Sequence, residues 1–218
     1  MKSNIKTYLI LHPDRRDFID RRWFSDPDVE IFDAIIPPPA GKIEISSKEC
    51  VSLTPGELGC TLSHYSILRK ALTRDQGYKY YLILEDDLEY KSNWLEDLID
   101  LINISGEMFD MFCLSHALSR GNDSCRTVIN KEPYIDRYVM EKGNGPGGAV
   151  AWLSTGATIK ILYDLYQVKF SVADGMWNFH NTKDMVIYTT GNVLTRPQSS
   201  FFRPASNPRL WVSTIREN

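Results

Sequence analysis

The chain has 218 residues, of which 43% are hydrophobic and 24% are charged, a composition typical of globular proteins. Its formal net charge of −3 excludes the strong positive field of a protein that binds nucleic acid or an anionic membrane. No stretch approaches the roughly 18 apolar residues of a membrane span. The length favours one domain over residues 1–218 rather than two.

Cysteine usage and the N-terminus indicate the compartment. Cys50, Cys60, Cys113 and Cys125 form no CxxC pair and lack zinc-like spacing. Cys60 and Cys113 lie in apolar patterns and are predicted to be core residues. The apolar run 8–11 is too short for the core of a signal peptide. These features predict a reduced, cytoplasmic location.

Strand-like and helix-like segments alternate from the N-terminus. Residues 7–11 are apolar and predict a first strand, and the polar stretch 14–24 then favours a helix. Residues 29–36 predict a second strand. The Pro- and Gly-rich segment 37–41 ends it.

The next helix has a clear start. Thr54 is a candidate N-cap, Pro55 falls at the first helical position, and Glu57 stands three residues after the cap. This is a capping box with a proline start. Apolar residues at helical spacing then continue to Leu72.

The second half continues the alternation. A buried strand is predicted over residues 80–84, directly before Glu85, Asp86 and Asp87. The other predicted elements are a helix capped by Asn93 and reaching Ile102, a strand over 111–114, a polar loop over 117–145, a strand over 147–153, a helix over 156–166, a strand over 186–190 and an irregular tail over 195–218.

This order predicts a single α/β domain with a mainly parallel central sheet flanked by helices. No GxGxxG follows the first strand, and no GxxxxGK[ST] occurs. A dinucleotide-binding fold of the usual kind and a P-loop are therefore not expected.

Three adjacent carboxylates carry the strongest functional signal. Glu85, Asp86 and Asp87 end a predicted strand, and the carboxyl edge of an open α/β sheet is where ligands bind. Like charges repel unless a cation joins them, and a divalent cation with a phosphorylated ligand suits such a group. The alternative interpretation is a solvated acidic turn.

Two motifs resemble glycosyltransferase family 25, which holds lipooligosaccharide and collagen galactosyltransferases. They are residues 53–64 (LTPGELGCTLSH) and 82–87 (LILEDD), with one helix between them. Residues 15–16, 32–35, 147–153, 156–157 and 197–198 also resemble family segments. The resemblance implies a GT-A fold, a nucleotide-sugar donor, a Mn²⁺ or Mg²⁺ ion, and inversion at the anomeric carbon.

The resemblance also implies residue roles. Asp87 is expected to hold the metal, Glu85 the metal or its water shell, and Asp86 the ribose or the water shell. His180 is a further candidate metal ligand, or simply a partly buried histidine among aromatic residues. The residues expected to bind the donor are His12, which replaces the family's Asn-Leu-type turn, Arg15, Arg16, Asp33, Ala34, His64, Glu85, Asp86, Gly147 and Gly148.

An inverting transfer needs a base that takes the proton of the acceptor hydroxyl. Asp174 is the candidate, with Asp184 as its rival, and either also suits a turn. For several donor residues a bland interpretation stays open: a solvated Arg16, a strand-end turn at Asp33, and a satisfied core histidine at His64.

The sequence therefore predicts a metal-dependent inverting glycosyltransferase. The resemblance implies that the donor is UDP-galactose or UDP-glucose, and the acceptor is expected to be a hydroxyl of a glycan or glycoprotein. No nucleic-acid partner is expected. Two alternatives stay open: a metal-dependent nucleotidyltransferase or phosphohydrolase, and a catalytically silent carbohydrate-binding domain.

Overall fold

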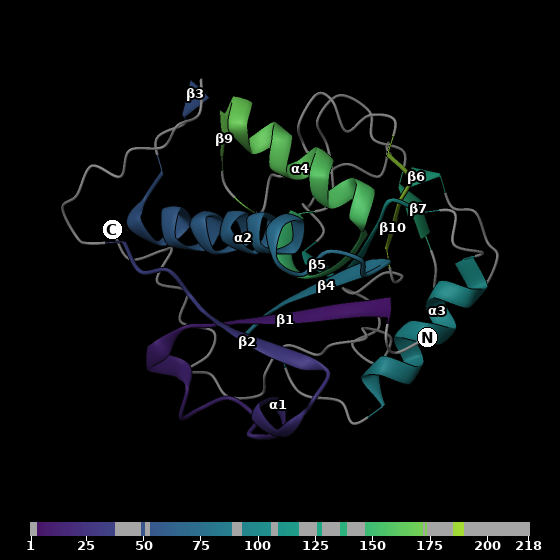
Figure 1. The fold of residues 1–218 in the computed structure, drawn as a ribbon, viewed down its shortest axis with the longest axis horizontal. Helices are drawn as coiled ribbons and strands as arrows, with labels where there is room; N and C mark the ends of the chain where they lie inside the picture. Colours follow the sequence, from purple (N-terminus) through teal and green to yellow (C-terminus); the bar gives the residue numbers. More distant parts are fainter. Residues whose placement is uncertain are drawn as a thin grey trace.

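A mixed β-sheet forms the centre of the computed structural model (Figure 1). The structure describes residues 4–37, 49–50, 53–88, 93–105, 109–117, 126–127, 136–138, 147–171, 173 and 185–189. The strands of the sheet are β1 (Ile5–Leu11), β2 (Val29–Asp33), β4 (Tyr80–Glu85), β5 (Met111–Ala117), β6 (Arg126–Thr127), β7 (Asp136–Tyr138), β8 (Gly147–Thr155) and β10 (Ile187–Thr189).

The sheet has the strand order β2-β1-β4-β8-β5-β10-β7-β6. β8 is antiparallel to β4 and β5, and β7 is antiparallel to β10 and β6. The other strands share one direction, which confirms the mainly parallel sheet. The antiparallel direction of β8 was not predicted, because an apolar run indicates a buried strand and does not indicate its direction in the sheet. Apart from this sheet, β3 (Glu49–Cys50) pairs with β9 (Lys169–Phe170).

Helices cover both faces of the sheet, as the α/β prediction requires (Figure 1). α2 (Pro55–Thr73) and α4 (Gly156–Val168) lie on one face, and α1 (Arg22–Ser25) and α3 (Trp94–Ser105) lie on the other. Each face has its own apolar core. Tyr8, Ile83 and Trp152 belong to the α2 side, whereas Leu9, Leu84 and Trp94 belong to the α3 side. Among the described helices, none combines the length and the hydropathy needed to cross a membrane.

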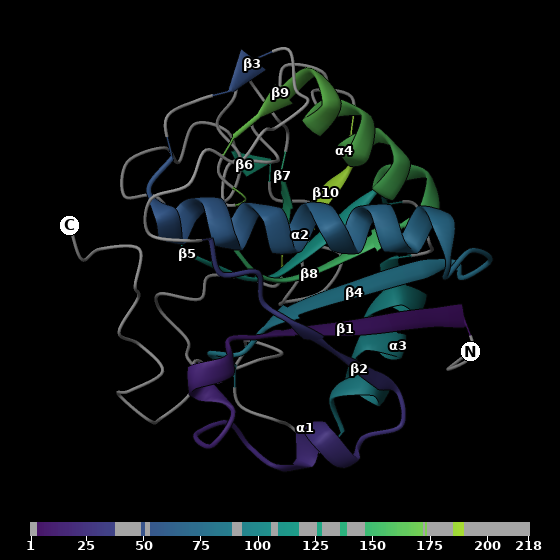
Figure 2. The ribbon, with the colours of Figure 1, turned by 60° about the vertical axis from the view of Figure 1, so that its left-hand side comes forward.

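The predicted capping box of α2 is confirmed. The Thr54 hydroxyl accepts a hydrogen bond from the Glu57 backbone N–H (3.3 Å), and the Glu57 carboxylate accepts one from the Thr54 N–H (2.8 Å). α2 runs antiparallel to β1 and β4 (Figure 2). Its N-terminal half therefore lies at the edge where these strands end.

Two predicted elements are shorter than expected. The stretch 14–24 forms a 3₁₀ turn (Pro13–Arg15) and the single-turn helix α1, because Asp20 accepts a hydrogen bond from the Arg22 N–H and starts a new turn. The strand predicted over 29–36 ends at Asp33.

Other predictions are confirmed, extended or left untested. Cys113 is buried, Cys60 is half-buried, and both are free thiols. Part of the predicted loop 117–145 instead forms β6 and β7. The tail 195–218 lies outside the described residues.

Candidate functional site

The ends of three neighbouring strands bring the predicted site residues together. In the register of the sheet, Leu11 at the end of β1 pairs with Asp33, and Ile10 pairs with Glu85. Gly147, the first residue of β8, pairs with Ala117 at the end of β5. The segments that begin at His12, Asp33 and Glu85 therefore meet at one carboxyl edge, where open α/β sheets bind ligands.

Asp86 ties the loop after β1 to the end of β4. The residue is buried, with 4% of its surface exposed. One oxygen accepts a hydrogen bond from the His12 backbone N–H (2.7 Å), and the other accepts one from the Arg15 guanidinium (2.6 Å). Burial raises the pKa of Asp86, and the positive charge of Arg15 and the His12 N–H only partly offset this effect. His12 and Arg15 are thus positioned through Asp86.

Glu85 is held from the opposite side by α2. His64 Nε2 lies 2.9 Å from Glu85 Oε1, and the Cys60 thiol lies 3.6 Å from the same oxygen. Burial works to raise the pKa of Glu85, but the hydrogen bond from His64, its charge and the Cys60 thiol outweigh burial, so the pKa is lowered. The contacts therefore favour an ionised Glu85.

His64 is fully buried and stacks against Trp152, with ring centroids 6.1 Å apart. Its Nδ1 atom has no hydrogen-bond partner among the described residues. Because an ionised carboxylate can only accept, His64 Nε2 carries the proton that is donated to Glu85.

The ligand atoms of Cys60, His64 and Glu85 lie within 4.8 Å of one another, close enough to hold a metal ion. A thiolate, an imidazole and a carboxylate would suit Zn²⁺. A histidine that ligates a metal normally donates its other ring N–H to an acceptor, and in the described part of the chain Nδ1 faces none. The cluster is therefore better explained as a hydrogen-bond network that orients Glu85.

Asp87 lies in an environment that disfavours its charged form, in contrast to Glu85. Its Oδ1 atom is buried without a hydrogen-bond partner in the described chain. Burial, followed by the charges of Glu85 and Asp86, raises the pKa of Asp87 to about 7. An unpaired, buried carboxylate oxygen beside two further carboxylates fits a hard divalent cation, which prefers oxygen ligands.

The ends of β1 and β2 are joined by an exposed ion pair. An Arg16 guanidinium nitrogen lies 2.7 Å from Asp33 Oδ1, and the guanidinium also lies 5.5 Å from the ring centre of Phe24. The Ala34 N–H donates to the Leu11 carbonyl (2.9 Å), and its methyl group packs against the core. Arg16, Asp33 and Ala34 therefore lie together at the ends of β1 and β2, whereas Arg15 turns to Asp86.

Some predicted site residues are placed only in part. Gly147 and Gly148 form the start of β8 at the carboxyl edge. Asp174, Asp184 and His180 lie outside the described residues, so their roles stay predictions. The residue before Asp174 is anchored, because the Ala173 N–H donates to the buried Thr61 hydroxyl (3.0 Å).

The sequence predicted Cys60 only as a core residue, and it indicated no site role for Gly59, Thr61 and Ser63. All of them lie in the first half of α2 and contact segments of the site. The sequence signal for these four residues is their place inside the motif 53–64.

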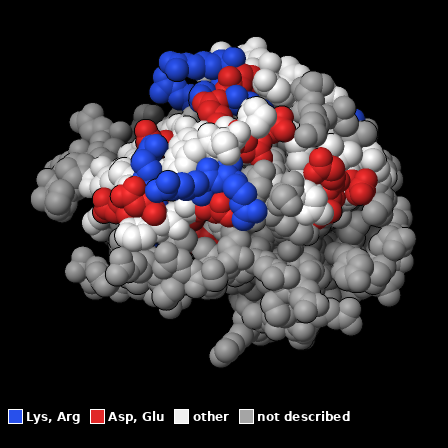
Figure 3. Space-filling model, turned by 90° about the horizontal axis from the view of Figure 1, so that it is seen from below, with Lys and Arg blue, Asp and Glu red and all other residues white. Residues whose placement is uncertain are grey.

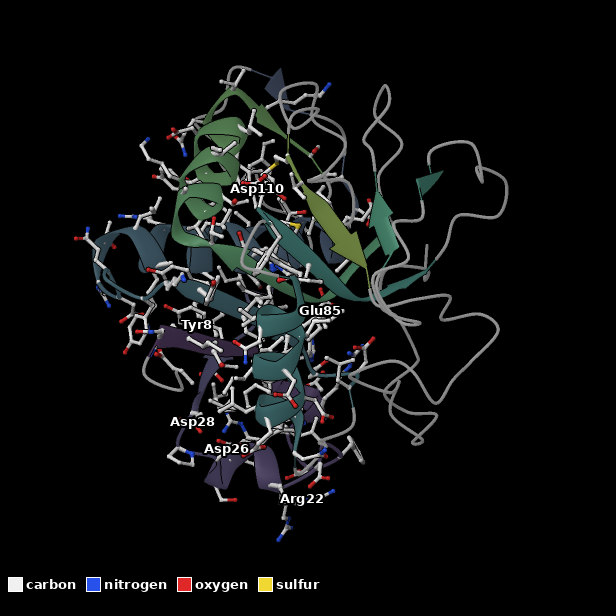
Figure 4. The ribbon with its side chains drawn as sticks, turned by 90° about the vertical axis from the view of Figure 1, so that its right-hand side faces the viewer. Tyr8, Arg22, Asp26, Asp28, Glu85 and Asp110 are labelled. Atoms are coloured by element: carbon white, nitrogen blue, oxygen red, sulfur yellow. The ribbon has the colours of Figure 1, made fainter. Side chains whose placement is uncertain are left out.

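Charged groups elsewhere are not part of this site. Arg22, Asp26 and Asp28 lie at the α1 end of the molecule, separated from Glu85 (Figure 4). On the face seen from below, the Lys and Arg side chains drawn adjoin Asp and Glu side chains (Figure 3). This mixture agrees with local ion pairs such as Arg22–Asp20.

The fold and the site define an α/β protein with a carboxylate site at the carboxyl edge of its sheet. The family model described as glycosyltransferase family 25 (LPS biosynthesis protein) matches residues 5–144, well over half of the chain. The chain belongs to this family, which confirms the predicted resemblance.

Individual relatives match shorter segments. A bovine protein named "probable inactive glycosyltransferase 25 family member 3" is 38% identical over 87 residues, covering 38% of this chain and 14% of the relative. Its human counterpart, named inactive, is 38% identical over 66 residues, covering 29% and 11%. A "putative glycosyltransferase" of Acanthamoeba polyphaga mimivirus is 46% identical over 43 residues, covering 20% and 13%. The chain thus spans less than a sixth of the length of these relatives.

Proposed function

We propose that the chain is a metal-dependent inverting glycosyltransferase that moves a hexose from UDP-galactose or UDP-glucose to a hydroxyl of a glycan or glycoprotein. The proposal depends on one observation above the others. Asp87 presents a buried, unpaired oxygen beside Glu85 and Asp86 at the carboxyl edge. Family membership supports glycosyl transfer as the reaction.

In this proposal, Asp87 and Glu85 would hold Mn²⁺ or Mg²⁺. When bound, the ion supplies positive charge for the departing diphosphate. Glu85 is suited to a ligand role because His64 and Cys60 orient it and lower its pKa. Asp87 is suited because nothing in the described chain satisfies its Oδ1.

The other residues bind and orient the donor. Asp86 fixes Arg15 beside the carboxylates, where a guanidinium can contact a phosphate oxygen. Arg16, Asp33 and Ala34 lie at the ends of β1 and β2 and form the nucleoside side of the site. In this proposal the diphosphate would lie between the two groups of residues.

Transfer forms a bond between the acceptor oxygen and the anomeric carbon and breaks the bond from that carbon to the diphosphate. The proton of the acceptor hydroxyl goes to a base. Asp174 is the proposed base, and Thr61 anchors the residue before it. A pH–rate profile of Asp174→Asn that keeps its basic limb would remove Asp174 from this role.

A catalytically silent family member is the second candidate, since the bovine and human relatives are named inactive. The intact Glu85-Asp86-Asp87 triplet favours the active form in this chain. The two candidates differ in turnover and not in fold.

A thermal-shift panel of nucleotide-sugars with and without Mn²⁺, followed by a UDP-release assay, tests the function. We expect Mn²⁺-dependent stabilisation by a UDP-hexose, and release of UDP when an acceptor is added. Stabilisation without UDP release over a broad acceptor panel would support the silent candidate. Release of pyrophosphate or inorganic phosphate would instead support a nucleotidyltransferase or phosphohydrolase.

A further inference from the structure

The first half of α2 approaches the segment after β2 at a contact that only glycine allows. A Cβ atom on Gly59 would lie 2.6 Å from the Ile35 carbonyl oxygen and 2.9 Å from Pro37 Cδ. Real Cβ atoms essentially never come this close to a backbone oxygen. Any larger residue at position 59 must therefore push the helix and this segment apart.

Ser63, one helical turn after Gly59, stabilises the same contact between α2 and Ile35 with a hydrogen bond. Its hydroxyl accepts a hydrogen bond from the Ile35 N–H (2.9 Å) and donates one to the Gly59 carbonyl (2.7 Å). Ser63 is fully buried, so water cannot replace this bond without a rearrangement. Residues four apart lie on one helix face, and Gly59 and Ser63 both face Ile35.

The segment Asp33–Pro37 is thus held on two sides. The Ala34 N–H donates to Leu11 at the end of β1, and the Ile35 N–H donates to Ser63 of α2. The Asp33 side chain remains exposed and pairs with Arg16. The course of residues 34–37, directly after Asp33, therefore depends on how closely α2 approaches Ile35.

We propose that Gly59 and Ser63 are positioning residues that set the nucleoside side of the donor site, an inference that rests on the proposed function. Cys60 and His64, which follow Gly59 and Ser63 in the sequence, contact Glu85 at the end of β4. One helix segment thereby fixes two parts of the site. Its Gly59/Ser63 face positions the segment after β2, and its Cys60/His64 face positions Glu85, the carboxylate that would hold the metal.

This arrangement predicts that binding of the nucleoside and metal-dependent binding of the diphosphate depend on different residues of α2. Changes at Gly59 or Ser63 should weaken binding of UMP without metal and of UDP with Mn²⁺ by the same factor, because both ligands share the nucleoside. A change at His64 should leave UMP binding unaltered and weaken only the Mn²⁺-dependent binding of UDP. A general loss of stability would not produce this pattern.

The test uses the full chain with Gly59→Ala and Ser63→Ala. Gly156→Ala at the start of α4 is the matched glycine control, since its Cβ would lie 3.6 Å or more from its neighbours. Ser105→Ala at the end of α3 is the matched serine control, since its hydroxyl is buried and donates to the Ile102 carbonyl (2.7 Å) of its own helix. Calorimetry gives Kd for UMP and for UDP with Mn²⁺, and hydrogen exchange follows the Ile35 amide.

We expect Gly59→Ala and Ser63→Ala to raise both Kd values about tenfold and to speed exchange of the Ile35 amide, while both controls match the unmodified chain. Unchanged Ile35 exchange in Ser63→Ala would overturn the contact itself. Faster exchange with unchanged UMP and UDP binding would overturn the donor role. If the unmodified chain binds no uridine nucleotide with or without Mn²⁺, the proposed function fails, and the donor role fails with it.

Discussion

His64 Nε2 and Glu85 Oε1 lie 2.9 Å apart, although His64 is fully buried in α2 and Glu85 ends β4. The hydrogen bond joins the two motifs that identify the family, residues 53–64 and 82–87. It gives a physical reason for their joint occurrence, since the helix motif orients the first carboxylate of the strand motif.

The first prediction concerns this hydrogen bond. His64→Leu removes the donor at similar volume, whereas His64→Gln can keep a donor near the position of Nε2. We expect His64→Leu to lower the free energy of unfolding by about 1.5–3 kcal/mol and to weaken Mn²⁺-dependent UDP binding, and His64→Gln to restore part of both. Urea unfolding and calorimetry measure these effects. Equal behaviour of the two variants would show that the hydrogen bond is not the cause.

The second prediction concerns Asp87. Its pKa of about 7 means that, without a cation, ionising Asp87 is less favourable in the folded chain than in the unfolded chain. Asp87→Asn should therefore raise metal-free stability at pH 8, by on the order of a few kcal/mol at most, and abolish transfer. Thermal unfolding with and without Mn²⁺ should reverse the order of the two proteins. Stabilisation of Asp87→Asn by Mn²⁺ equal to that of the unmodified chain would exclude Asp87 as a ligand.

The third prediction is a pH dependence with a definite sign. Because the pKa of Asp87 is raised in the folded state, the folded chain binds more protons than the unfolded chain between about pH 4 and 7. The contribution of Asp87 to metal-free stability should fall as pH rises through this window. Mn²⁺ must displace the same proton, so its affinity should rise about tenfold per pH unit towards pH 7 and then level off. Isothermal titrations at several pH values measure the slope, which should be lost in Asp87→Asn.

The fourth prediction separates two neighbouring arginines. Arg15 pairs with the buried Asp86, whereas Arg16 pairs with the exposed Asp33. Arg15→Ala leaves a buried carboxylate without its cation and should destabilise the fold by about 3 kcal/mol. Arg16→Ala should cost less than about 1 kcal/mol and act mainly on donor binding. Denaturant unfolding compares them, and equal losses would contradict the difference in burial.

The fifth prediction concerns the candidate base. Thr61→Val keeps the shape of the side chain and removes the acceptor of the Ala173 N–H. If Asp174 is the base, kcat should fall about tenfold or more while KM for the donor stays unchanged. Thr61→Ser, which keeps the hydroxyl, should restore kcat. Loss of donor affinity with normal kcat would instead place Thr61 on the donor side.

Much of the fold follows from local patterns in the sequence. The capping box at Thr54 and the apolar runs of β1, β4 and β8 predicted elements that the structure contains. These signals are local, because a capping residue or a buried strand is specified by its immediate neighbours. The helix predicted over residues 14–24 was wrong, because the hydrogen bond from the Arg22 N–H to Asp20 starts a new turn there and the helix is not continuous.

The sequence by itself determined that three carboxylates end a buried strand, and that the chain resembles a glycosyltransferase family. The tertiary structure decided how the three differ. Asp86 accepts hydrogen bonds from His12 and Arg15. Glu85 contacts His64 and Cys60. Of the three carboxylates, Asp87 alone keeps a buried oxygen without a partner in the described chain. These partners lie 21 to 74 residues away along the chain. Only the packing of α2 and β1 against β4 brings them within hydrogen-bond distance, and no local pattern encodes that packing.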